Sequence, residues 1–477
     1  MTAPLWTLDA LATACRGRIV GAPAAAITGI SIDSRTILPG EAFFAIRGDV
    51  HDGHGFVAKA LAAGAGVAVV AEEKLADMPG GGRYVVVDDV LEALRRLGVA
   101  ARARTGAKIV AVTGSVGKTS TKEALRLVLS AQGRVHASVA SFNNHWGVPL
   151  TLARMPADVD FGVFEIGMNH AGEITPLTRM VRPHVAIVTT VAAVHLEFFA
   201  SVDDIARAKA EIFLGLEPGG AAVVNGDIEQ TPILIEAARA VGARVVTFGE
   251  GEGLDSRLGT IALLPDCSTL KATVLGEPVT AKIGAPGRHV AVNALAVLSA
   301  AVLAGADLAR AALALADLAP PEGRGQRSSL RIGKSEALLL DESYNANPAS
   351  MRAAIDLLGQ MPVGLRGRRI AVLGDMLELG ETGPALHAGL APALEAAAID
   401  LVFCCGPLMR SLWQALPAER RGAYAETSND LQPILLEAVS AGDAVMVKGS
   451  LGSRMGPIVK ALQARHGAVA VSEDASA

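Results

Sequence analysis

Short apolar runs alternate with helical patterns through the middle of this chain. Five of the runs have the length and the unbroken apolar character of strands buried on both faces; they cover residues 109–113, 161–166, 185–191, 221–225 and 244–248. Helical patterns separate most of them, which predicts an α/β fold with a doubly wound, mostly parallel sheet. Such sheets bind ligands beyond the carboxyl ends of their strands, so polar residues there are candidates for a functional site.

The chain has 477 residues, which is too long for one hydrophobic core. Residues 1–103 form a first unit without a nucleotide motif, and a basic stretch ends that unit. The run PPEGRG at 320–325 is typical of a second linker, and the strand-like runs after it again end in polar loops. The pattern predicts a small α/β N-terminal domain (1–103), a central domain (104–321) and a C-terminal α/β domain (322–477).

Composition excludes several classes of function. The net charge of −5, the pI of about 6.1 and the aromatic content of 4% provide no basic, aromatic-rich face for nucleic acid. The four cysteines show no C-x-x-C spacing, so neither a zinc site nor a disulfide framework is indicated. The most apolar stretch, 290–306, is interrupted by Asn293 and is too short to span a membrane. The N-terminus lacks the basic region of a signal peptide, and we expect a cytoplasmic monomer that is not embedded in a membrane.

The strongest chemical signal is a glycine turn between the first of these strands and a helix. The turn and the start of the helix consist of Gly114, Ser115, Val116, Gly117, Lys118, Thr119 and Ser120. Glycines let backbone N–H groups face a phosphate, and the helix N-terminus adds partial positive charge. In such a turn the lysine meets the β- and γ-phosphates and the threonine hydroxyl ligates Mg²⁺. The turn therefore predicts binding of ATP or GTP; the other interpretation is a plain turn that joins a strand to a helix.

Two more polar residues fall at strand ends on the same side of the predicted sheet. Glu165 interrupts an apolar run, where a carboxylate is costly unless a cation meets it. His195 follows the run 185–191 and is either a metal ligand or a satisfied structural histidine. In the N-terminal unit, Ser34, Arg35 and Arg47 are donors of the kind that hold an anionic ligand, although a plain surface loop is equally compatible with them.

Lys209 lies on the apolar face of a predicted helix. It shares a helical stripe with Ile205 and Ile212, whereas Arg207 and Glu211 are predicted to pair on the opposite face. A lysine in that register either extends its amine to solvent or brings it to the metal site.

Together these motifs resemble those of the Mur ligases, ATP-dependent enzymes that form amide bonds in cell-wall precursors. The resemblance covers nearly the whole chain. It rests on the glycine turn, Lys209, DSR at 33–35, FFA at 43–45, NN at 143–144, GVPLT at 147–151, EIGM at 165–168, HLE at 195–197, DESYNANP at 341–348 and GDMLELG at 374–380. The SYNANP run is typical of the branch that adds D-alanyl-D-alanine. The Asp-Asn-Pro-Arg motif of the branch that adds the third peptide residue is absent from the sequence.

The resemblance implies an N-terminal domain that holds the UDP end of a muropeptide, a central P-loop ATPase and a Rossmann-like C-terminal domain that closes over the site. Lys118 and Thr119 would hold ATP and the first Mg²⁺, and Glu165 would contact the metals. His195 would ligate the second metal, and Lys209 would be carbamylated. Catalysis would therefore depend on Lys118, Glu165, His195 and Lys209.

Further contacts follow from the same resemblance. Asn293 and Asn345 would contact adenine, and Arg324 and Asp341 would meet phosphate and ribose. The substrates would be contacted by Ser34, Arg35, Arg47, Asn143, Asn144 and Lys448. The sequence departs from the family pattern at Val290, Glu342 and Leu451, where the family often has asparagine, aspartate and arginine.

The implied reaction joins the carboxylate of a UDP-N-acetylmuramoyl-tripeptide to the amine of D-alanyl-D-alanine through an acyl phosphate, for peptidoglycan synthesis. These small molecules are the partners expected. Two alternatives remain open. One is a folate-type polyglutamate ligase, which shares the short P-loop, and the other is a P-loop regulatory or binding module.

Overall fold

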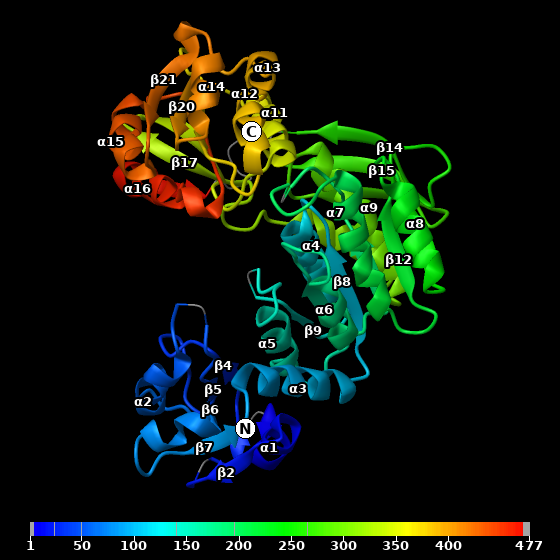
Figure 1. The fold of residues 1–477 in the computed structure, drawn as a ribbon. Coiled ribbons are helices and arrows are strands. Elements are labelled where there is room, and N and C mark those ends of the chain that lie inside the picture. The colour runs from blue at the N-terminus through cyan, green and yellow to red at the C-terminus, as the bar shows by residue number, and fades with distance from the viewer. Residues whose placement is uncertain are drawn as a thin grey trace.

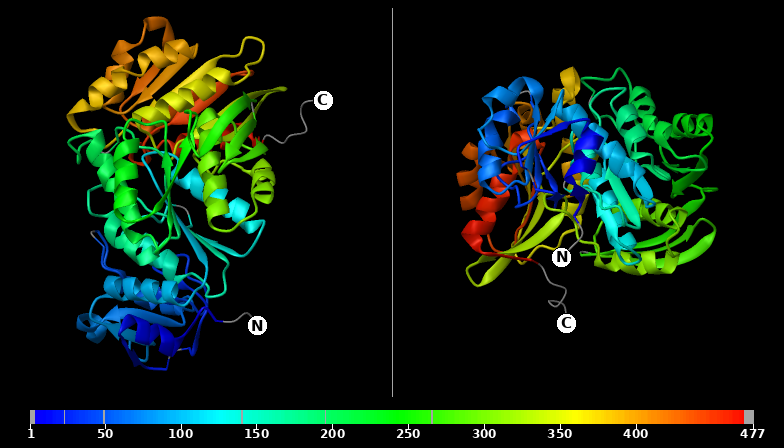
Figure 2. Two further views of the ribbon diagram at one scale, coloured as in Figure 1. Left: turned by 90° about the vertical axis from the view of Figure 1, so that its right-hand side faces the viewer. Right: turned by 90° about the horizontal axis from the view of Figure 1, so that it is seen from below.

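Three α/β lobes follow one another along the chain, each with a sheet of its own (Figures 1 and 2). The structure is a computed structural model that describes residues 4–470 except 23, 49, 140, 195 and 265. The α/β class predicted from the hydrophobic pattern is confirmed. No helix in the described part of the chain is long and apolar enough to cross a membrane.

The first lobe is a five-stranded sheet in the order β2-β7-β6-β5-β4, in which β4 to β7 run parallel and β2 is antiparallel to β7. A separate pair, β1 and β3, lies beside it. The strands are β1 (Trp6–Thr7), β2 (Arg18–Val20), β3 (Ala26–Ile27), β4 (Ile30–Ser31), β5 (Ala42–Phe44), β6 (Val67–Ala71) and β7 (Tyr84–Val87). The helices are α1 (Leu8–Cys15), α2 (Val57–Ala62) and α3 (Val90–Ala103).

The second lobe has nine strands in the order β16-β15-β14-β13-β12-β11-β8-β10-β9. They are β8 (Lys108–Thr113), β9 (Val135–Ala137), β10 (Phe161–Glu165), β11 (Val185–Val188), β12 (Ala221–Asn225), β13 (Arg244–Gly249), β14 (Ser256–Leu263), β15 (Ser268–Val274) and β16 (Glu277–Ile283). The five strands predicted from apolar runs are confirmed as β8, β10, β11, β12 and β13, although β11 is shorter than its run. The antiparallel strands β14 to β16 were not predicted, because their alternating, half-exposed pattern does not resemble a buried parallel strand.

Helices cover both faces of this second sheet. On one face α4 (Lys118–Ser130), α9 (Arg288–Leu303) and α10 (Leu308–Ala314) pack against the even-numbered side chains of β8, such as Val110 and Val112. On the other face, Ile109 and Ala111 meet α5 (Gly147–Ala153), α6 (Ile174–Val181), α7 (Val202–Ala210) and α8 (Thr231–Ala240). Burial on both faces explains why β8 is an unbroken apolar run.

The third lobe is a seven-stranded sheet in the order β21-β20-β19-β22-β18-β17-β23. The first five run parallel, and β17 and β23 form an antiparallel edge. Its strands are β17 (Gln326–Ile332), β18 (Ser335–Glu342), β19 (Arg369–Gly374), β20 (Leu401–Cys405), β21 (Arg421–Ala425), β22 (Ala444–Lys448) and β23 (Ala468–Ala470). Its helices are α11 (Pro348–Gln360), α12 (Gly383–Ala388), α13 (Ala391–Ala396), α14 (Met409–Ala415), α15 (Ser428–Ala438) and α16 (Gly456–His466).

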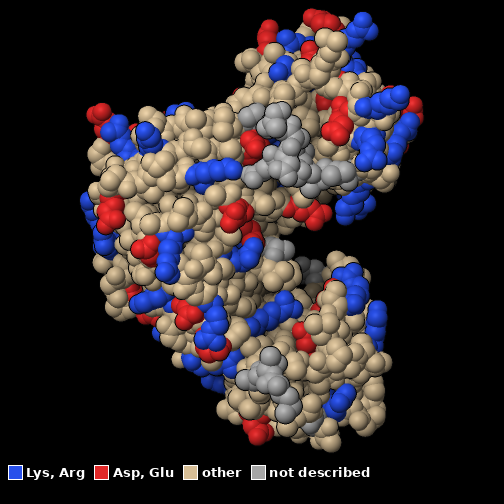
Figure 3. Space-filling model, turned by 180° about the vertical axis from the view of Figure 1, so that it is seen from behind, with Lys and Arg blue, Asp and Glu red and all other residues tan. Residues whose placement is uncertain are grey.

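The first lobe is fastened to the second by side chains from both. The Trp6 indole N–H donates to the Ala153 carbonyl at 2.9 Å, and the guanidinium of Arg104 lies 3.4 Å from the centre of the Trp6 ring. Arg154 donates to the Ile30 carbonyl at 2.7 Å. A wide hollow separates the first lobe from the third (Figure 3). The first two lobes are therefore held together by specific contacts, whereas the third lobe stands apart from the first.

Candidate active site

The glycine turn after β8 has the backbone geometry that only glycine adopts easily. Gly114 has φ 151° and Gly117 has φ 85°, and α4 begins directly after Gly117. A Cβ at Gly114 would lie 1.9 Å from the Thr189 hydroxyl oxygen, and one at Gly117 would lie 2.7 Å from the Asn293 side-chain nitrogen. The turn is therefore closely surrounded, and Asn293 from α9 lies beside it.

The end of β11 holds the turn in place. The Thr189 hydroxyl donates to the Val116 carbonyl at 2.6 Å, and the Ser115 backbone N–H donates to the Thr190 carbonyl at 2.9 Å. The Ser115 hydroxyl donates to the Ala192 carbonyl at 3.2 Å and accepts from the Ala192 N–H at 3.0 Å. Thr189 and Thr190 were not predicted as part of the site; their signal in the sequence is two threonines at the end of a strand in a doubly wound sheet.

Lys118 is half-buried and donates from its amine to the Gly114 carbonyl at 2.7 Å. Burial lowers the pKa of this amine; the nearby charge of Glu165 raises the pKa, and that of Arg324 lowers it further. Lys118 and Arg324 are thus two cations that face one space. An anion placed between them would relieve their repulsion.

Glu165 ends β10 and is 1% exposed. The Thr119 hydroxyl donates to its Oε2 at 2.9 Å, and the side-chain amide of Asn143 donates to its Oε1 at 2.8 Å. The partners that offset the cost of burying this carboxylate are hydrogen-bond donors. The structure therefore brings together three of the predicted residues, Thr119, Glu165 and Asn143.

Asn144 has a different place. Its side-chain oxygen accepts from the Gly147 N–H at 2.9 Å, at the start of α5. His195, the other residue predicted for a metal, lies outside the described residues. Within the described residues, no group of three or more His, Cys, Asp or Glu side chains could hold a metal ion.

Lys209 is 2% exposed and belongs to the buried stripe of α7, as predicted from its spacing to Ile205. Burial lowers the pKa of its amine well below 10.5, and the charge of Lys118 lowers it further. Within the described part of the chain, its amine makes no hydrogen bond or ion pair. The predicted pair of Arg207 with Glu211 is wrong: Arg207 bonds Asp204 within α7, and Glu211 lies beyond the end of this helix at Ala210. Glu211 instead accepts from the N–H groups of Gly172 and Thr175.

A cavity of about 1360 Å³ lies between the second and third lobes. Residues of the glycine turn, Glu165 and Asn143 line it from the second lobe. Residues of the third lobe and of the segment that leads into it complete the wall; they include Arg324, Glu342, Tyr344, Asn345 and Lys448. The cavity thus joins predicted nucleotide residues that are far apart in the sequence.

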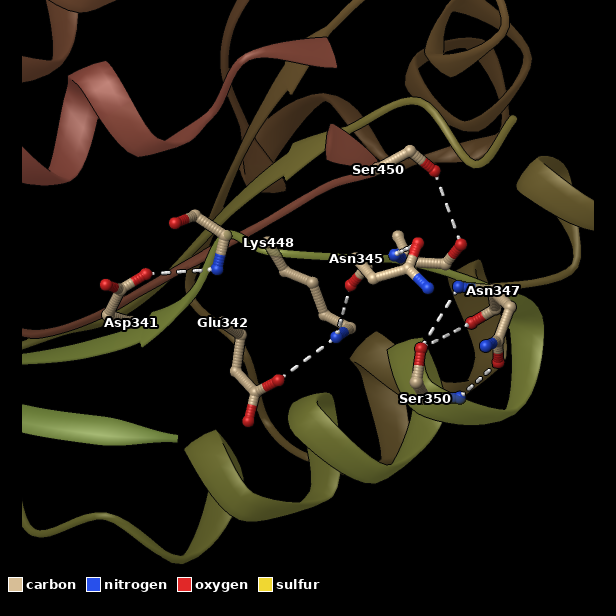
Figure 4. Close-up of polar contacts among 9 residues, drawn as sticks. Asp341, Glu342, Asn345, Asn347, Ser350, Lys448 and Ser450 are labelled. Atoms are coloured by element: carbon tan, nitrogen blue, oxygen red, sulfur yellow. Dashed lines mark hydrogen bonds and ion pairs between the residues drawn. The ribbon is translucent and has the colours of Figure 1, made fainter. Parts of the chain in front are cut away.

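The third-lobe wall is built at the ends of β18 and β22 (Figure 4). The Lys448 amine donates to Oε2 of Glu342 at 3.1 Å and to the Asn345 carbonyl at 3.0 Å. Asp341, one residue earlier on β18, accepts from the Ser343 N–H at 3.0 Å, and burial raises the pKa of its carboxyl. Because neighbouring strand residues face opposite sides, Glu342 and not Asp341 lines the cavity.

Two sequence comparisons agree with this arrangement. Family models described as the Mur ligase middle domain, the glutamate ligase domain of Mur ligases and the catalytic domain of the Mur ligase family match residues 112–301, 326–451 and 26–126. A UDP-N-acetylmuramoyl-tripeptide–D-alanyl-D-alanine ligase from Escherichia coli is 34% identical over 460 residues, covering 96% of this chain and 98% of the relative. The chain belongs to the Mur ligase family.

Solved structures extend the match to three dimensions. MurF from Acinetobacter baumannii superposes with a TM-score of 0.83 at 30% identity, covering 96% of this chain and 99% of the other. MurF from Thermotoga maritima, solved in complex with ADP, has a TM-score of 0.75 at 26% identity, covering 92% and 98%. This Mur ligase is therefore an ATP-dependent ligase.

The three donors predicted in the first lobe of this Mur ligase lie away from the cavity. Ser34 is buried, and Arg47 is exposed. Arg35 donates from Nε and Nη2 to the two oxygens of the Asp33 carboxylate, and this hydrogen bonding lowers the pKa of Asp33 to about 2. They are not among the residues that line the cavity.

Proposed function

We propose that this Mur ligase joins D-alanyl-D-alanine to UDP-N-acetylmuramoyl-tripeptide at the expense of ATP, for peptidoglycan synthesis. The observation that carries the proposal is the shared cavity, where the glycine turn of the second lobe faces the SYNANP run of the third. The relative from Escherichia coli is named for this activity, and the match covers nearly its whole length.

The reaction proceeds in two steps. The terminal carboxylate of the tripeptide takes the γ-phosphoryl group of ATP, which gives an acyl phosphate and ADP. The amine of D-alanyl-D-alanine then attacks the acyl carbon, phosphate leaves, and the amine loses a proton. Catalysis therefore consists of positioning two anions and an amine and of offsetting negative charge.

Lys118 is the proposed cation for the β- and γ-phosphates. The main-chain N–H groups of the turn, residues 114–120, cradle the same phosphates. Thr119 and Glu165 provide a hydroxyl and a carboxylate 2.9 Å apart, an oxygen donor set that fits Mg²⁺ shared with phosphates. Bound there, Mg²⁺ would neutralise charge that develops on the transferred phosphoryl group. His195 remains the proposed ligand of a second metal.

Lys209 is the proposed site of a carbamate. Its amine is buried, and its lowered pKa makes the neutral form available to attack CO₂. The amine nitrogen bonds the carbon of CO₂ and loses a proton, so a neutral amine becomes an anion with two oxygens. Such an anion could orient a ligand of the second metal.

The remaining contacts are proposed by lobe. Asn293 and Asn345 meet adenine from opposite sides of the cavity, and Arg324 meets phosphate. Asp341 is proposed to meet ribose, which requires the end of β18 to shift when nucleotide binds, because Glu342 and not Asp341 lines the cavity. Asn143, Asn144 and Lys448 are proposed to contact the substrates, and Lys448 retains one N–H donor beyond its two bonds. Ser34, Arg35 and Arg47 are proposed to hold the UDP end, which requires substrate to bridge the first lobe and the cavity. We further propose a cytoplasmic monomer with domains 1–103, 104–321 and 322–477.

Phosphate release with purified components tests the proposal. Release should require ATP, Mg²⁺, UDP-N-acetylmuramoyl-tripeptide and D-alanyl-D-alanine together. A nucleotide-dependent switch would release phosphate slowly and independently of both acceptors, and a folate-type ligase would respond to folate and glutamate instead. If omission of D-alanyl-D-alanine leaves release unchanged, the proposed activity is wrong.

A further inference from the structure

Ser450 lies where three loops of the third lobe meet. It follows β22, whose neighbours in the sheet are β18 and β19, so the loops after these three strands converge at one edge. Its side chain is 4% exposed. The Ser450 hydroxyl donates to the Ala346 carbonyl at 3.3 Å and accepts from the Leu377 N–H at 3.0 Å. One buried hydroxyl thus joins the SYNANP loop to the GDMLELG loop.

The segment that Ser450 holds carries a side chain of the cavity wall. Asn345 is exposed and lines the cavity, whereas Ala346 is buried directly beneath it. The carbonyls of these two neighbours are held by Lys448 and Ser450 respectively (Figure 4). The backbone of this short loop is therefore fixed at two consecutive peptide groups, by the last residue of β22 and by the loop that follows it.

The amide of Asn345 is also oriented by this backbone. Its Oδ1 accepts from the Ala346 N–H at 2.8 Å, which directs its Nδ2 away from that bond. Within the described residues, Nδ2 makes no hydrogen bond to protein. A donor that is free, exposed to the cavity and fixed in direction suits an acceptor on a ligand.

The GDMLELG loop, which Ser450 contacts at Leu377, also contacts the second lobe. The Glu378 carbonyl, next along the chain, accepts from the Glu197 N–H at 3.5 Å, and a Cβ at Gly380 would lie 3.5 Å from Glu197 Cα. The hydroxyl of Ser450 therefore connects the Asn345 loop to the loop that meets the second lobe.

We propose that Ser450 is a positioning residue for nucleotide binding, which acts by holding the backbone beneath Asn345. The inference rests on the proposed function, in which Asn345 contacts adenine. Removing the hydroxyl leaves the Ala346 carbonyl and the Leu377 N–H without this partner and frees the loop to move. The free Nδ2 of Asn345 would then lose its fixed direction, and nucleotide would bind less tightly.

Binding of ADP to the full-length enzyme, measured by isothermal titration calorimetry, tests the inference without turnover. Ser450→Ala should raise the Kd of ADP about threefold to tenfold, the range of one modest hydrogen bond. In an Asn345→Ala background the same substitution should change the Kd less than twofold, because the residue through which it acts is gone. Ser428→Ala, an equally buried serine at the start of α15 and away from the cavity, is the matched control and should bind ADP normally.

The outcomes separate the inference from the proposed function. An unchanged Kd in Ser450→Ala, or an equal weakening with and without Asn345, would overturn the positioning role. Ser450→Cys keeps nearly the same volume and replaces the alanine variant if that variant does not fold. It should also raise the Kd of ADP. A wild-type enzyme that binds ADP but shows no D-alanyl-D-alanine-dependent phosphate release would instead refute the proposed ligase activity.

Discussion

The Thr119 hydroxyl donates to the buried Glu165 carboxylate at 2.9 Å, which joins the first turn of α4 to the end of β10. Glu165→Gln keeps the size of the side chain but removes the negative charge. We expect kcat to fall by about 10²–10³-fold, as for the loss of one electrostatic group in a site of this kind. The Mg²⁺ concentration for half-maximal rate should rise. Both are measured by phosphate release over a Mg²⁺ titration.

Glu173→Gln is the matched control, since Glu173 is an exposed carboxylate in the loop before α6. It should leave kcat and the Mg²⁺ requirement unchanged. A Glu165→Gln enzyme with a normal Mg²⁺ requirement would show that the carboxylate only supports the fold.

A second prediction concerns pH and His387, which is fully buried in α12. Its Nε2 accepts from the Met376 N–H at 2.9 Å, and its Nδ1 bonds the Gly383 carbonyl at 2.6 Å. Burial lowers the pKa of His387 below 6.5, so the unfolded chain binds the proton more readily than the folded one. Stability is therefore fully present above about pH 6.5 and is lost as the pH falls, by at most about 1.4 kcal/mol per pH unit for this group.

Melting temperature measured between pH 5 and pH 7.5 tests whether stability falls on acidification. His387→Asn should reduce the loss of melting temperature on acidification, whereas substitution of the exposed His51 with asparagine should not. The melting temperature of His387→Asn should still fall to some extent on acidification, because burial also lowers the pKa of His136. A wild-type melting temperature that rises on acidification would contradict the prediction.

The sequence predicted the parts of the site that depend on spacing within one segment. The glycine turn, the Lys209 stripe and the apolar strands of the second lobe are all local periodicities, and the structure has each of them. Strand ends then placed Glu165 near Thr119, because parallel strands bring their carboxyl ends to one edge of a sheet.

Other features depended on contacts between distant segments and could not be predicted this way. Thr189 supports the glycine turn from a neighbouring strand, and no local pattern distinguishes it from any other threonine. Whether Asp341 or Glu342 lines the cavity depends on which face of β18 meets it, a difference of one residue in register. Ser450 likewise acquires its partners only when three loops converge.

The third prediction is that the third lobe closes on the second when nucleotide and muropeptide bind. Leu318 is still packed on the second lobe, whereas Gly323 already pairs with the third, its carbonyl accepting from the Tyr344 N–H at 3.1 Å. The hinge is therefore confined to residues 319–322. Lobes joined by so short a segment move relative to one another by default.

Distance measurements with paired labels can follow this motion. All four native cysteines are buried, so labels can be directed to introduced cysteines at exposed sites, Val50, Leu313 and Leu365, one in each lobe. The distance between labels at 313 and 365 should shorten with an ATP analogue plus UDP-N-acetylmuramoyl-tripeptide. The distance between 50 and 313 should change less, because Trp6 and Arg154 fasten the first lobe to the second. An unaltered 313–365 distance would refute closure.

The last prediction concerns the carbamate on Lys209. Lys209 is 2% exposed, the pKa of its amine lies well below the ordinary value because of burial, and no described residue pairs with the amine. Incubation with ¹³C-bicarbonate should therefore give a carbamate signal by ¹³C NMR that Lys209→Ala lacks and that substitution of the exposed Lys460 with alanine retains.

Lys209→Ala should lose most activity yet still bind ADP, because the glycine turn is intact. Acetate should restore part of the activity by occupying the vacated anionic position. A fully active Lys209→Ala enzyme, or a wild type with no carbamate signal, would refute the modification.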